Sequence, residues 1–283
     1  MFCLIAAVAI ALVASSAPSH NAPPLISKVE HFFVLSADAE KLFRFFKEDI
    51  GLPVVWPFRR YGDFSSGGVS LGNVVMEIEL RNDQPYSGPA AFKGIAFEPV
   101  GDAEDVVMQL DHRDVPHASP SPYKYVRNGE ERVGWVNVYL NIPPEGVKLF
   151  FCDYKDREQV ANGRRKAAAA LNDGGGGPLG IIRLKELELG VRSYPEALAE
   201  WHKLIAGSAS DTGATFLFGN GPALHVVRAK EDSIKRVVIS VRSAKAARLY
   251  LASKGLLGGS SGATFWVTPA AVSGLRIEFI EEN

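Results

Sequence analysis

Hydrophobic and polar positions between residues 27 and 80 predict five short elements. The run Lys-Val-Glu-His-Phe-Phe-Val-Leu at 28–35 is rich in β-branched and aromatic residues, which predicts a strand. In residues 36–51 apolar side chains recur every three or four positions, which predicts a helix. Strands are predicted at 53–58, 67–71 and 74–80, because glycine-rich turns separate these runs. The unit therefore has the order β-α-β-β-β.

Three further segments repeat this order. In the second, strands are predicted at 92–99, 134–140 and 147–154, with a helix at 102–110 that Asp102 can cap. One strand of this unit is not evident from the pattern. A third unit begins at Ile181 and a fourth at Ser233. The predicted fold class is α+β: four βαβββ units arranged as two paired modules, with curved mixed or antiparallel sheets around clefts.

The same patterns predict the domain boundaries. Residues 1–17 are expected to be a signal peptide and 18–26 a spacer, followed by a first domain at 27–154. Residues 155–180 are expected to be a linker with a short helix at 158–171 and a flexible glycine run, because ordering each glycine costs conformational entropy. The second domain is predicted at 181–283.

Eleven apolar residues, Leu4–Ala14, precede small residues that suit signal-peptidase cleavage near Ala17. We therefore expect a secreted or periplasmic protein without stable membrane insertion after cleavage. The run lacks a preceding lysine or arginine, so an uncleaved anchor or a mis-assigned start codon, with a cytoplasmic protein, is the alternative.

Composition and charge narrow the function class. The chain is 47% hydrophobic and 22% charged, which is typical of a globular protein with a sizeable core. A net charge of -1 gives no indication of nucleic-acid binding, so a small molecule is the expected partner. The two cysteines are Cys3, in the predicted signal peptide, and Cys152. An intramolecular disulfide in the mature chain is thereby excluded, as is a cysteine-rich zinc site, and Cys152 is expected to be buried and inert.

Four motifs carry a family resemblance: Val-Glu-His-Phe-Phe-Val, Phe-Ser-Ser-Gly-Gly-Val-Ser-Leu-Gly-Asn-Val-Val-Met-Glu, Gly-Ile-Ala-Phe-Glu-Pro and Gly-Leu-Arg-Ile-Glu-Phe. Together with the fourfold unit they resemble the vicinal oxygen chelate superfamily, which contains glyoxalase I, the bleomycin-resistance proteins and the extradiol dioxygenases. The resemblance implies a divalent metal in a cleft, held by ligands from the first and last strands of the units. It also implies lyase, isomerase or dioxygenase chemistry on substrates with vicinal oxygens.

Carried over residue by residue, the resemblance gives an incomplete ligand set. The first-strand positions fall on His31, Gly94, Leu187 and Arg236, and the last-strand positions on Glu77, Phe150, His225 and Glu278. The implied metal ligands are His31, Glu77 and Glu278. Glu79 and Glu98 share strand faces with family positions, so either could complete the set.

Each of these residues also has a simpler interpretation. His31 could be a core or substrate-contacting histidine, Glu77 a solvent-facing residue, and Glu278 part of a solvated acidic C-terminus. His225 is expected to be structural or to contact ligand. Glu77 or Glu79 would act as the general base.

Aromatic residues predict an apolar ligand pocket in the first domain, with ordinary core packing as the alternative. They are Trp56, Phe58, Tyr61, Phe64 and Trp135. The leading hypothesis is a protein that binds a small oxygen-bearing or aromatic compound, with a divalent metal if it is an enzyme. The alternative is a metal-free binding or sequestering protein of the bleomycin-resistance type, which the incomplete ligand set favours.

Overall fold

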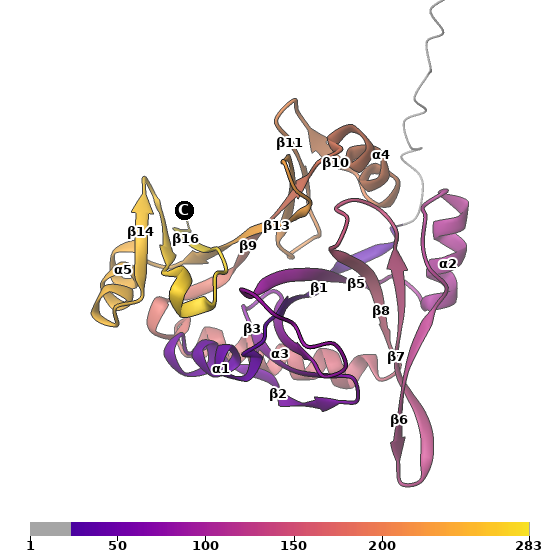
Figure 1. Ribbon diagram of the computed structural model, residues 1–283, viewed down its shortest axis with the longest axis horizontal. Helices are drawn as coiled ribbons and strands as arrows, with labels where there is room; N and C mark the ends of the chain where they lie inside the picture. Colours follow the sequence, from indigo (N-terminus) through magenta and orange to yellow (C-terminus); the bar gives the residue numbers. More distant parts are fainter. Residues whose placement is uncertain (1–23, 283) are drawn as a thin grey trace, which may run out of the picture.

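The computed structural model describes residues 24–282 (Figure 1). The predicted signal peptide, with its cleavage site, lies outside this part of the chain, as does most of the spacer. Among residues 24–282, no helix combines the length and the apolar character needed to cross a membrane.

Two eight-stranded sheets form the framework, one in each module, as the fourfold repeat predicts. The first has the order β2-β3-β4-β1-β5-β8-β7-β6. In it β1 and β5 lie antiparallel at the centre, and each pairs in parallel with the last strand of its own unit. The strands are β1 (Ile26–Leu35), β2 (Val54–Tyr61), β3 (Phe64–Ser70), β4 (Val75–Arg81), β5 (Ala91–Pro99), β6 (Ser121–Arg127), β7 (Glu130–Leu140) and β8 (Lys148–Tyr154).

The second sheet repeats this topology in the order β10-β11-β12-β9-β13-β16-β15-β14. Its central antiparallel pair is β9 with β13, and the parallel partners are β12 and β16. The strands are β9 (Ile181–Val191), β10 (Gly207–Ala209), β11 (Gly213–Phe216), β12 (Ala223–Arg228), β13 (Ser233–Val241), β14 (Leu257–Ser261), β15 (Thr264–Val267) and β16 (Ile277–Glu281).

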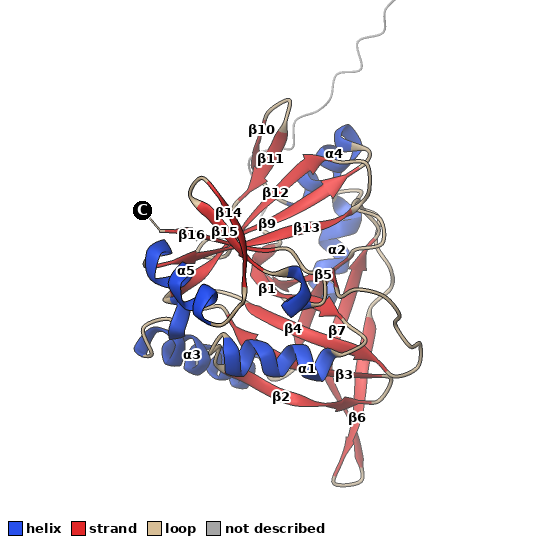
Figure 2. Cartoon of the chain, turned by 60° about the vertical axis from the view of Figure 1, so that its left-hand side comes forward, coloured by secondary structure: helices blue, strands red, loops and turns tan. Residues whose placement is uncertain are grey.

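Each unit contributes one helix, and a fifth helix connects the modules (Figure 2). Asp102 caps α2 through a reciprocal capping box with Asp105, as expected from its position before the helix. The predicted helix at 36–51 is shorter and ends as a π-helical turn, Phe45–Asp49. The helices are α1 (Ala39–Arg44), α2 (Ala103–His112), α3 (Arg157–Asp173), α4 (Tyr194–Leu204) and α5 (Ala244–Ser253), with 3-10 turns at Gly177–Leu179 and Pro269–Val272.

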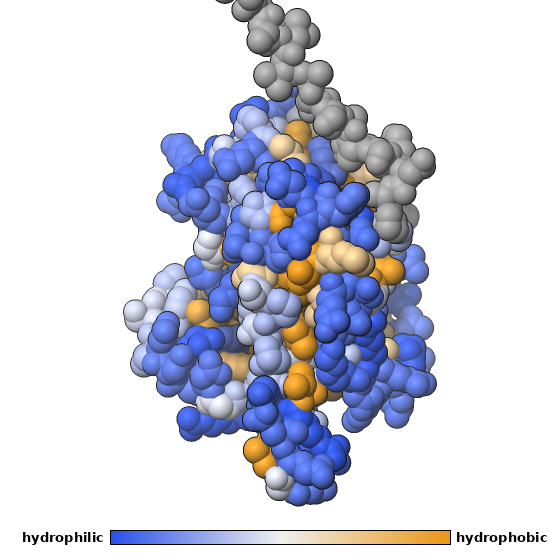
Figure 3. Space-filling view, turned by 90° about the vertical axis from the view of Figure 1, so that its right-hand side faces the viewer, coloured by the Kyte–Doolittle hydropathy of each residue, from blue (hydrophilic) through white to orange (hydrophobic). Residues whose placement is uncertain are grey.

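Two sequence expectations need correction. The strand that the pattern of the second unit did not reveal is β6, which forms a long hairpin with β7. The tip of this hairpin protrudes at the bottom of Figure 3, and a narrow apolar stripe crosses the otherwise hydrophilic face above it. The glycine run at 174–177 forms hydrogen-bonded turns instead of an unstructured link. Gly176 has φ +85°, and a Cβ there would collide with the backbone of Ile181, so this tight turn requires glycine.

Apolar contacts also join the modules. The ring of Phe97 on β5 lies 6.1 Å from that of Trp201 on α4 and 5.8 Å from that of Phe218. Trp201 is fully buried, and its indole Nε1 donates a hydrogen bond of 3.2 Å to the carbonyl oxygen of Pro143. The hydrophobic core therefore continues from one module into the other.

Candidate functional site

The first sheet curls around an open cavity of about 1180 Å³. Strands β1, β4 and β8 supply its floor, the β6–β7 hairpin and β2 its sides, and the first half of α3 closes one end. Polar and aromatic side chains share the floor, and most of the side-wall side chains are aromatic. The floor includes His31, Phe33, Glu77, Glu79, Phe150, Cys152 and Tyr154.

A β-bulge aims His31 into this cavity. Val29 pairs with Phe97 and His31 with Ala96, so Glu30 is an extra residue in β1. A bulge disturbs the strict alternation of side chains between the two faces of a strand. In a regular strand the side chains of two adjacent residues point to opposite faces of the sheet. Because of the bulge, the imidazole Nδ1 of His31 instead contacts the Glu30 carboxylate.

Glu30 is held by the helix that connects the modules. Its carboxylate forms an ion pair with Arg164 on α3, and the Tyr154 hydroxyl donates to its Oε2 over 3.4 Å. The Arg164 guanidinium also lies over the Tyr154 ring, 5.0 Å from the centroid. Glu30 is buried, and burial lowers the pKa of Arg164 to about 9. A buried carboxylate is costly without such a partner, so these contacts fix the group that orients His31.

On its other side the imidazole faces Glu77. The Nε2 atom of His31 lies 3.3 Å from the Oε2 atom of Glu77, which comes from the neighbouring parallel strand β4. Burial lowers the pKa of His31, while the charges of Glu77 and Glu79 offset part of this shift. The ring is therefore neutral at neutral pH. Because Nδ1 points at Glu30, the proton of the neutral ring belongs on Nδ1 and the Nε2 lone pair faces Glu77.

Glu79 lies two residues further along the same face of β4. Burial, followed by the charge of Glu77, raises its pKa to about 7, although Lys148 and Arg81 act in the opposite direction. Such a carboxyl group exchanges its proton near neutral pH, as a general acid or base must. The nearby Cys152 thiol is different: its pKa is raised by burial, so it stays protonated, consistent with the expectation of an inert cysteine.

Stacked aromatic rings line the side of the cavity. Tyr123 on β6 and Trp135 on β7 stack with centroids 3.9 Å apart and an interplanar angle of 6°. Tyr61 and Phe64, at the turn between β2 and β3, stack on each other at 5.3 Å and meet Tyr123 edge-on. Trp56 also lines the cavity and donates from its indole Nε1 to the Ser66 hydroxyl over 3.3 Å.

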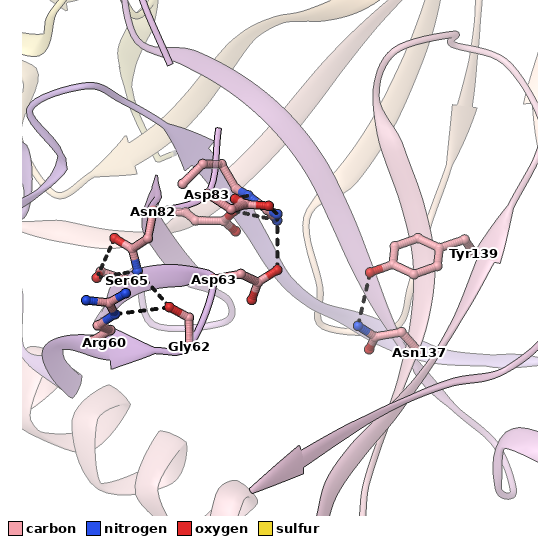
Figure 4. Close-up of polar contacts among 10 residues, drawn as sticks. Arg60, Gly62, Asp63, Ser65, Asn82, Asp83, Asn137 and Tyr139 are labelled. Carbon is pink, nitrogen blue, oxygen red and sulfur yellow. Dashed lines mark hydrogen bonds and ion pairs between the residues drawn. The ribbon is translucent and has the colours of Figure 1, made fainter. Parts of the chain in front are cut away.

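Polar contacts fix two parts of the cavity wall (Figure 4). At the β2–β3 turn, Arg81 pairs with Asp63 at 3.1 Å and with Asp83 at 2.8 Å. Across from them, Asn137 on β7 donates from its side-chain nitrogen to the Tyr139 hydroxyl over 3.3 Å. Charged and amide groups therefore accompany the aromatic side chains around the cavity.

The structure brings together most of the predicted first-domain residues but not all. His31, Glu77, Glu79, Trp56, Tyr61, Phe64 and Trp135 all line the cavity. Phe58 instead packs on the core, with its ring 5.9 Å from that of Phe43. Glu98 is not among the lining residues and forms an ion pair of 3.0 Å with Lys28, because β1 and β5 pair these two positions.

The other two predicted site residues belong to the second module. Glu278 lies on β16, where it binds Arg236 and Arg276, so it does not join His31 and Glu77 in one ligand set. His225 lies on β12, with its Nδ1 3.9 Å from the Glu186 carboxylate. The expected equivalence of Leu187 with His31 is wrong by one residue. In the first unit, Glu77 pairs with Phe33, which lies two residues after His31. In the third unit, His225 pairs with Glu188, so the counterpart of His31 is Glu186, two residues before Glu188.

Several residues of the site carry no sequence signal. Glu30 reaches the site through a bulge, which depends on pairing with β5, and Arg164 lies in a segment whose composition indicates only a linker helix. Tyr123 belongs to the strand that the sequence pattern did not reveal.

The donor set in the first module fits a divalent metal only in part. His31 Nε2 and Glu77 supply two converging ligand atoms, and the Glu30 contact to Nδ1 matches the way carboxylates orient metal-bound histidines. Within residues 24–282, no third His, Cys, Asp or Glu atom lies within 4.8 Å of both. Structural and catalytic zinc sites usually have three or four protein ligands, so water or ligand atoms would have to complete the shell.

The described part of the second module contains one triad whose ligand atoms lie within 4.8 Å of one another: Glu186, Glu188 and His225. Both carboxylates, however, already contact the guanidinium of Arg236, at 3.4 Å for Glu186 and 2.7 Å for Glu188. The triad therefore has suitable ligand atoms, but a cation of the chain itself competes for them.

Comparison with solved structures identifies the architecture. No protein-family model and no curated protein matches the sequence. The structure is similar to a variant of homoprotocatechuate 2,3-dioxygenase from Brevibacterium fuscum, with a TM-score of 0.62 and 12% identity over 94% of this chain and 75% of that one. It is also similar to the 2,3-dioxygenase LapB from Pseudomonas sp. KL28, with a TM-score of 0.61 and 12% identity over 93% and 94% of the two chains. The chain shares the fold of these two dioxygenases, with two paired modules built on curled mixed sheets.

A hypothetical protein from Staphylococcus aureus shares this architecture, with a TM-score of 0.61 and 11% identity over 90% of this chain and 99% of that one. At such identities the likeness concerns the fold alone, because one fold carries many unrelated activities. Function has to be argued from the cavity.

Proposed function

We propose that the first module binds a small aromatic compound bearing at least one hydroxyl group, and that His31 and Glu77 accept the hydroxyl proton. The facing atoms of these two residues carry the argument. Neutral His31 presents a lone pair on Nε2, and the Glu77 carboxylate presents another 3.3 Å away. Two largely buried acceptors face each other favourably only when a proton or a cation lies between them.

A phenolic or enolic hydroxyl satisfies this arrangement. Its proton would be shared by His31 Nε2 and Glu77, while Glu30 holds the imidazole in the correct tautomer from the other side. Transfer of the proton to His31 would create an imidazolium between two carboxylates, Glu30 and Glu77, which stabilise its charge. The site is thus suited to bind or to ionise a hydroxyl group.

The rest of the cavity supports an aromatic ligand. The Tyr123–Trp135 stack offers flat apolar surface along one side, and a planar ring of ligand would extend that stack. The volume of about 1180 Å³ exceeds the needs of a single ring, so the ligand is expected to carry a substituent that reaches toward the open side.

A metal-dependent enzyme is the second candidate, and the Glu30 contact to Nδ1 of His31 favours it. In that case His31 and Glu77 would hold the ion, which would act as a Lewis acid toward ligand oxygens. Glu79, whose pKa is raised to about 7, would hold or release a proton beside the bound compound.

Matched ligands test the proposal. Catechol, phenol and catechol dimethyl ether share an aromatic ring but differ in hydroxyl groups, so isothermal titration with each separates hydroxyl recognition from ring stacking. We expect catechol and phenol to bind and the dimethyl ether to bind at least about tenfold more weakly, the equivalent of about 1.4 kcal/mol. Binding of all three with equal affinity, or of none, would contradict the proposal.

The same titrations separate the two candidates. Each is carried out on protein treated with a chelator and on protein incubated with Zn²⁺, Mn²⁺ or Fe²⁺ and then desalted. Hydroxyl-dependent binding that survives chelation favours the metal-free protein. Binding that appears only with metal retained in stoichiometric amount favours the metal-dependent one.

A further inference from the structure

In each of the four units, one position of the first strand has the same backbone surroundings as His31. In each first strand an extra, bulged residue immediately precedes the position of His31: Glu30 in β1, Lys93 in β5, Lys185 in β9 and Lys235 in β13. The positions that follow these bulges are His31, Gly94, Glu186 and Arg236. Because the bulge recurs at the same place in all four units, this equivalence rests on backbone pairing and not on sequence similarity.

The last strands complete the set. Glu77 pairs with Phe33 of β1, and the residues in the same register of the other units are Phe150, His225 and Glu278. The first module therefore has two polar side chains, one apolar side chain and a glycine at these four positions. The second module has four polar side chains there: Glu186, His225, Arg236 and Glu278.

Arg236 contacts both carboxylates of the second set, Glu186 and Glu278, and also the nearby Glu188. Its Nη1 lies 2.5 Å from Glu278 Oε2, its Nη2 lies 2.7 Å from Glu188 Oε2, and the same nitrogen lies 3.4 Å from Glu186 Oε1. The Nε atom also donates to Glu188 over 2.9 Å. A planar guanidinium with five donors can satisfy several carboxylates at once in this way.

The balance of charge fits a permanent cation at this place. Burial alone would lower the pKa of Arg236, but hydrogen bonds to Glu188 and Glu278 raise it above its ordinary value. Glu278 is buried and receives a second cation, Arg276, whose Nε lies 2.6 Å from its Oε1. A divalent ion would need the same carboxylate oxygens and would be repelled by a guanidinium that cannot lose its charge.

We propose that the Arg236 guanidinium is the resident cation of the second module, in the place of a divalent metal, and that removing it turns the cluster into a metal site. Glu186, Glu188, Glu278 and His225 would then supply carboxylate and imidazole ligands of the kind that bind Zn²⁺ or Co²⁺. The triad of Glu186, Glu188 and His225 accordingly binds no divalent ion in the natural chain. This inference concerns the second module and does not depend on the ligand of the first.

Cobalt(II) is a suitable probe because its visible spectrum reports coordination by protein ligands. A His31→Ala background removes the first-module candidate ligand, so that any protein-bound cobalt belongs elsewhere. We expect this parent to retain no Co²⁺ after desalting. The variant with Arg236→His added should retain one equivalent, with affinity at least about tenfold above the parent. Adding Glu278→Gln should reduce that affinity again.

Arg276→Ala in the same background is the matched control. Arg276 contacts Glu278 from the exposed side, and its own side chain is 67% exposed. Its loss removes a positive charge without vacating the centre of the cluster, so no cobalt site should appear. Cobalt binding by the His31→Ala parent that is lost on His225→Ala would overturn the proposal, as would an Arg236→His variant that folds but retains no cobalt.

A second measurement does not require the histidine variant to fold. Arg236→Met leaves three carboxylates without their shared cation and should lower the melting temperature. Adding Glu188→Gln and Glu278→Gln should restore most of the loss, because the repulsion is removed. If Arg236→Met melts at the parent temperature, or if the two glutamines give no recovery, Arg236 is not the cation that holds the cluster together.

Discussion

The imidazole of His31 is held between two carboxylates, with Nδ1 on Glu30 and Nε2 at 3.3 Å from Glu77. Glu77 comes from the neighbouring strand, whereas Glu30 is the residue directly before His31 and reaches it only because β1 is bulged there. The orientation of the ring is therefore fixed by the protein before a ligand binds. Less conformational entropy is then lost when a ligand contacts His31.

Arg164 should contribute strongly to stability through Glu30. Arg164→Met leaves a fully buried carboxylate without its main cation, which is expected to cost about 3–5 kcal/mol in the free energy of unfolding. Chemical denaturation measures this loss. Adding Glu30→Gln should recover most of it, and Arg165→Met, at an exposed position one residue further on, should change little. A single Arg164→Met variant as stable as the natural protein would contradict this account of the buried pair.

Glu79 should give stability a specific pH dependence. Its pKa is about 7 in the folded protein against an ordinary 4.5, so the folded state holds a proton that the unfolded state has lost between these values. Stability due to this group therefore falls as the pH rises from about 4.5 to 7 and stays reduced above that range. Glu79→Gln should be more stable than the natural protein at pH 8 by about 1–3 kcal/mol.

The free energies of unfolding of the natural protein and of Glu79→Gln should converge toward pH 4, where Glu79 is protonated in both the folded and the unfolded state. Denaturation curves at a series of pH values measure the difference, and Glu104→Gln, at an exposed position on α2, serves as the control. A constant difference at all pH values would show that Glu79 does not titrate in this range.

Trp135 should report ligand binding directly. Its ring is stacked on Tyr123 at 3.9 Å and lines the cavity, so an aromatic ligand should change its fluorescence. Trp135→Leu keeps an apolar side chain but removes the flat surface, and should weaken ligand binding by about 1 kcal/mol. Trp266→Leu, in the second module, should leave the affinity unchanged. Equal affinity of the Trp135→Leu variant would show that stacking on this wall contributes nothing.

The sequence was sufficient to predict the fold because the repeated order of elements is a local signal. Each unit shows strand and helix periodicity within about 50 residues, and short connections leave few ways to pair such strands. The hairpin strand Ser121–Arg127 was not predicted, because it is largely exposed on both faces and has no alternation of apolar and polar residues.

The site was harder to predict than the fold, for two physical reasons. The stretch from the first-strand position to the glycine after the helix is one residue longer in the third unit (Glu186 to Gly207) than in the first (His31 to Gly51), so matching the two glycines selects Leu187, and a shift of one residue moves a side chain to the opposite face. Long-range partners such as Arg164 and Glu30 lie 134 positions apart in the chain, so no local pattern reveals them. The family resemblance alone points to His31 and Glu77, and the sequence pattern also predicts Phe58 and Glu98 in the site, although both lie outside the cavity lining.

Titration of catechol into the natural protein and into His31→Ala tests the central claim most directly, with His112→Ala, at an exposed position, as the matched control. We expect the natural protein and His112→Ala to bind equally well. His31→Ala should bind at least about 100-fold more weakly while losing only about 1–2 kcal/mol of stability, because Glu30 keeps Arg164 and Tyr154. A folded His31→Ala variant that binds catechol with undiminished affinity would contradict the claim that this cavity recognises a ligand hydroxyl through His31 and Glu77.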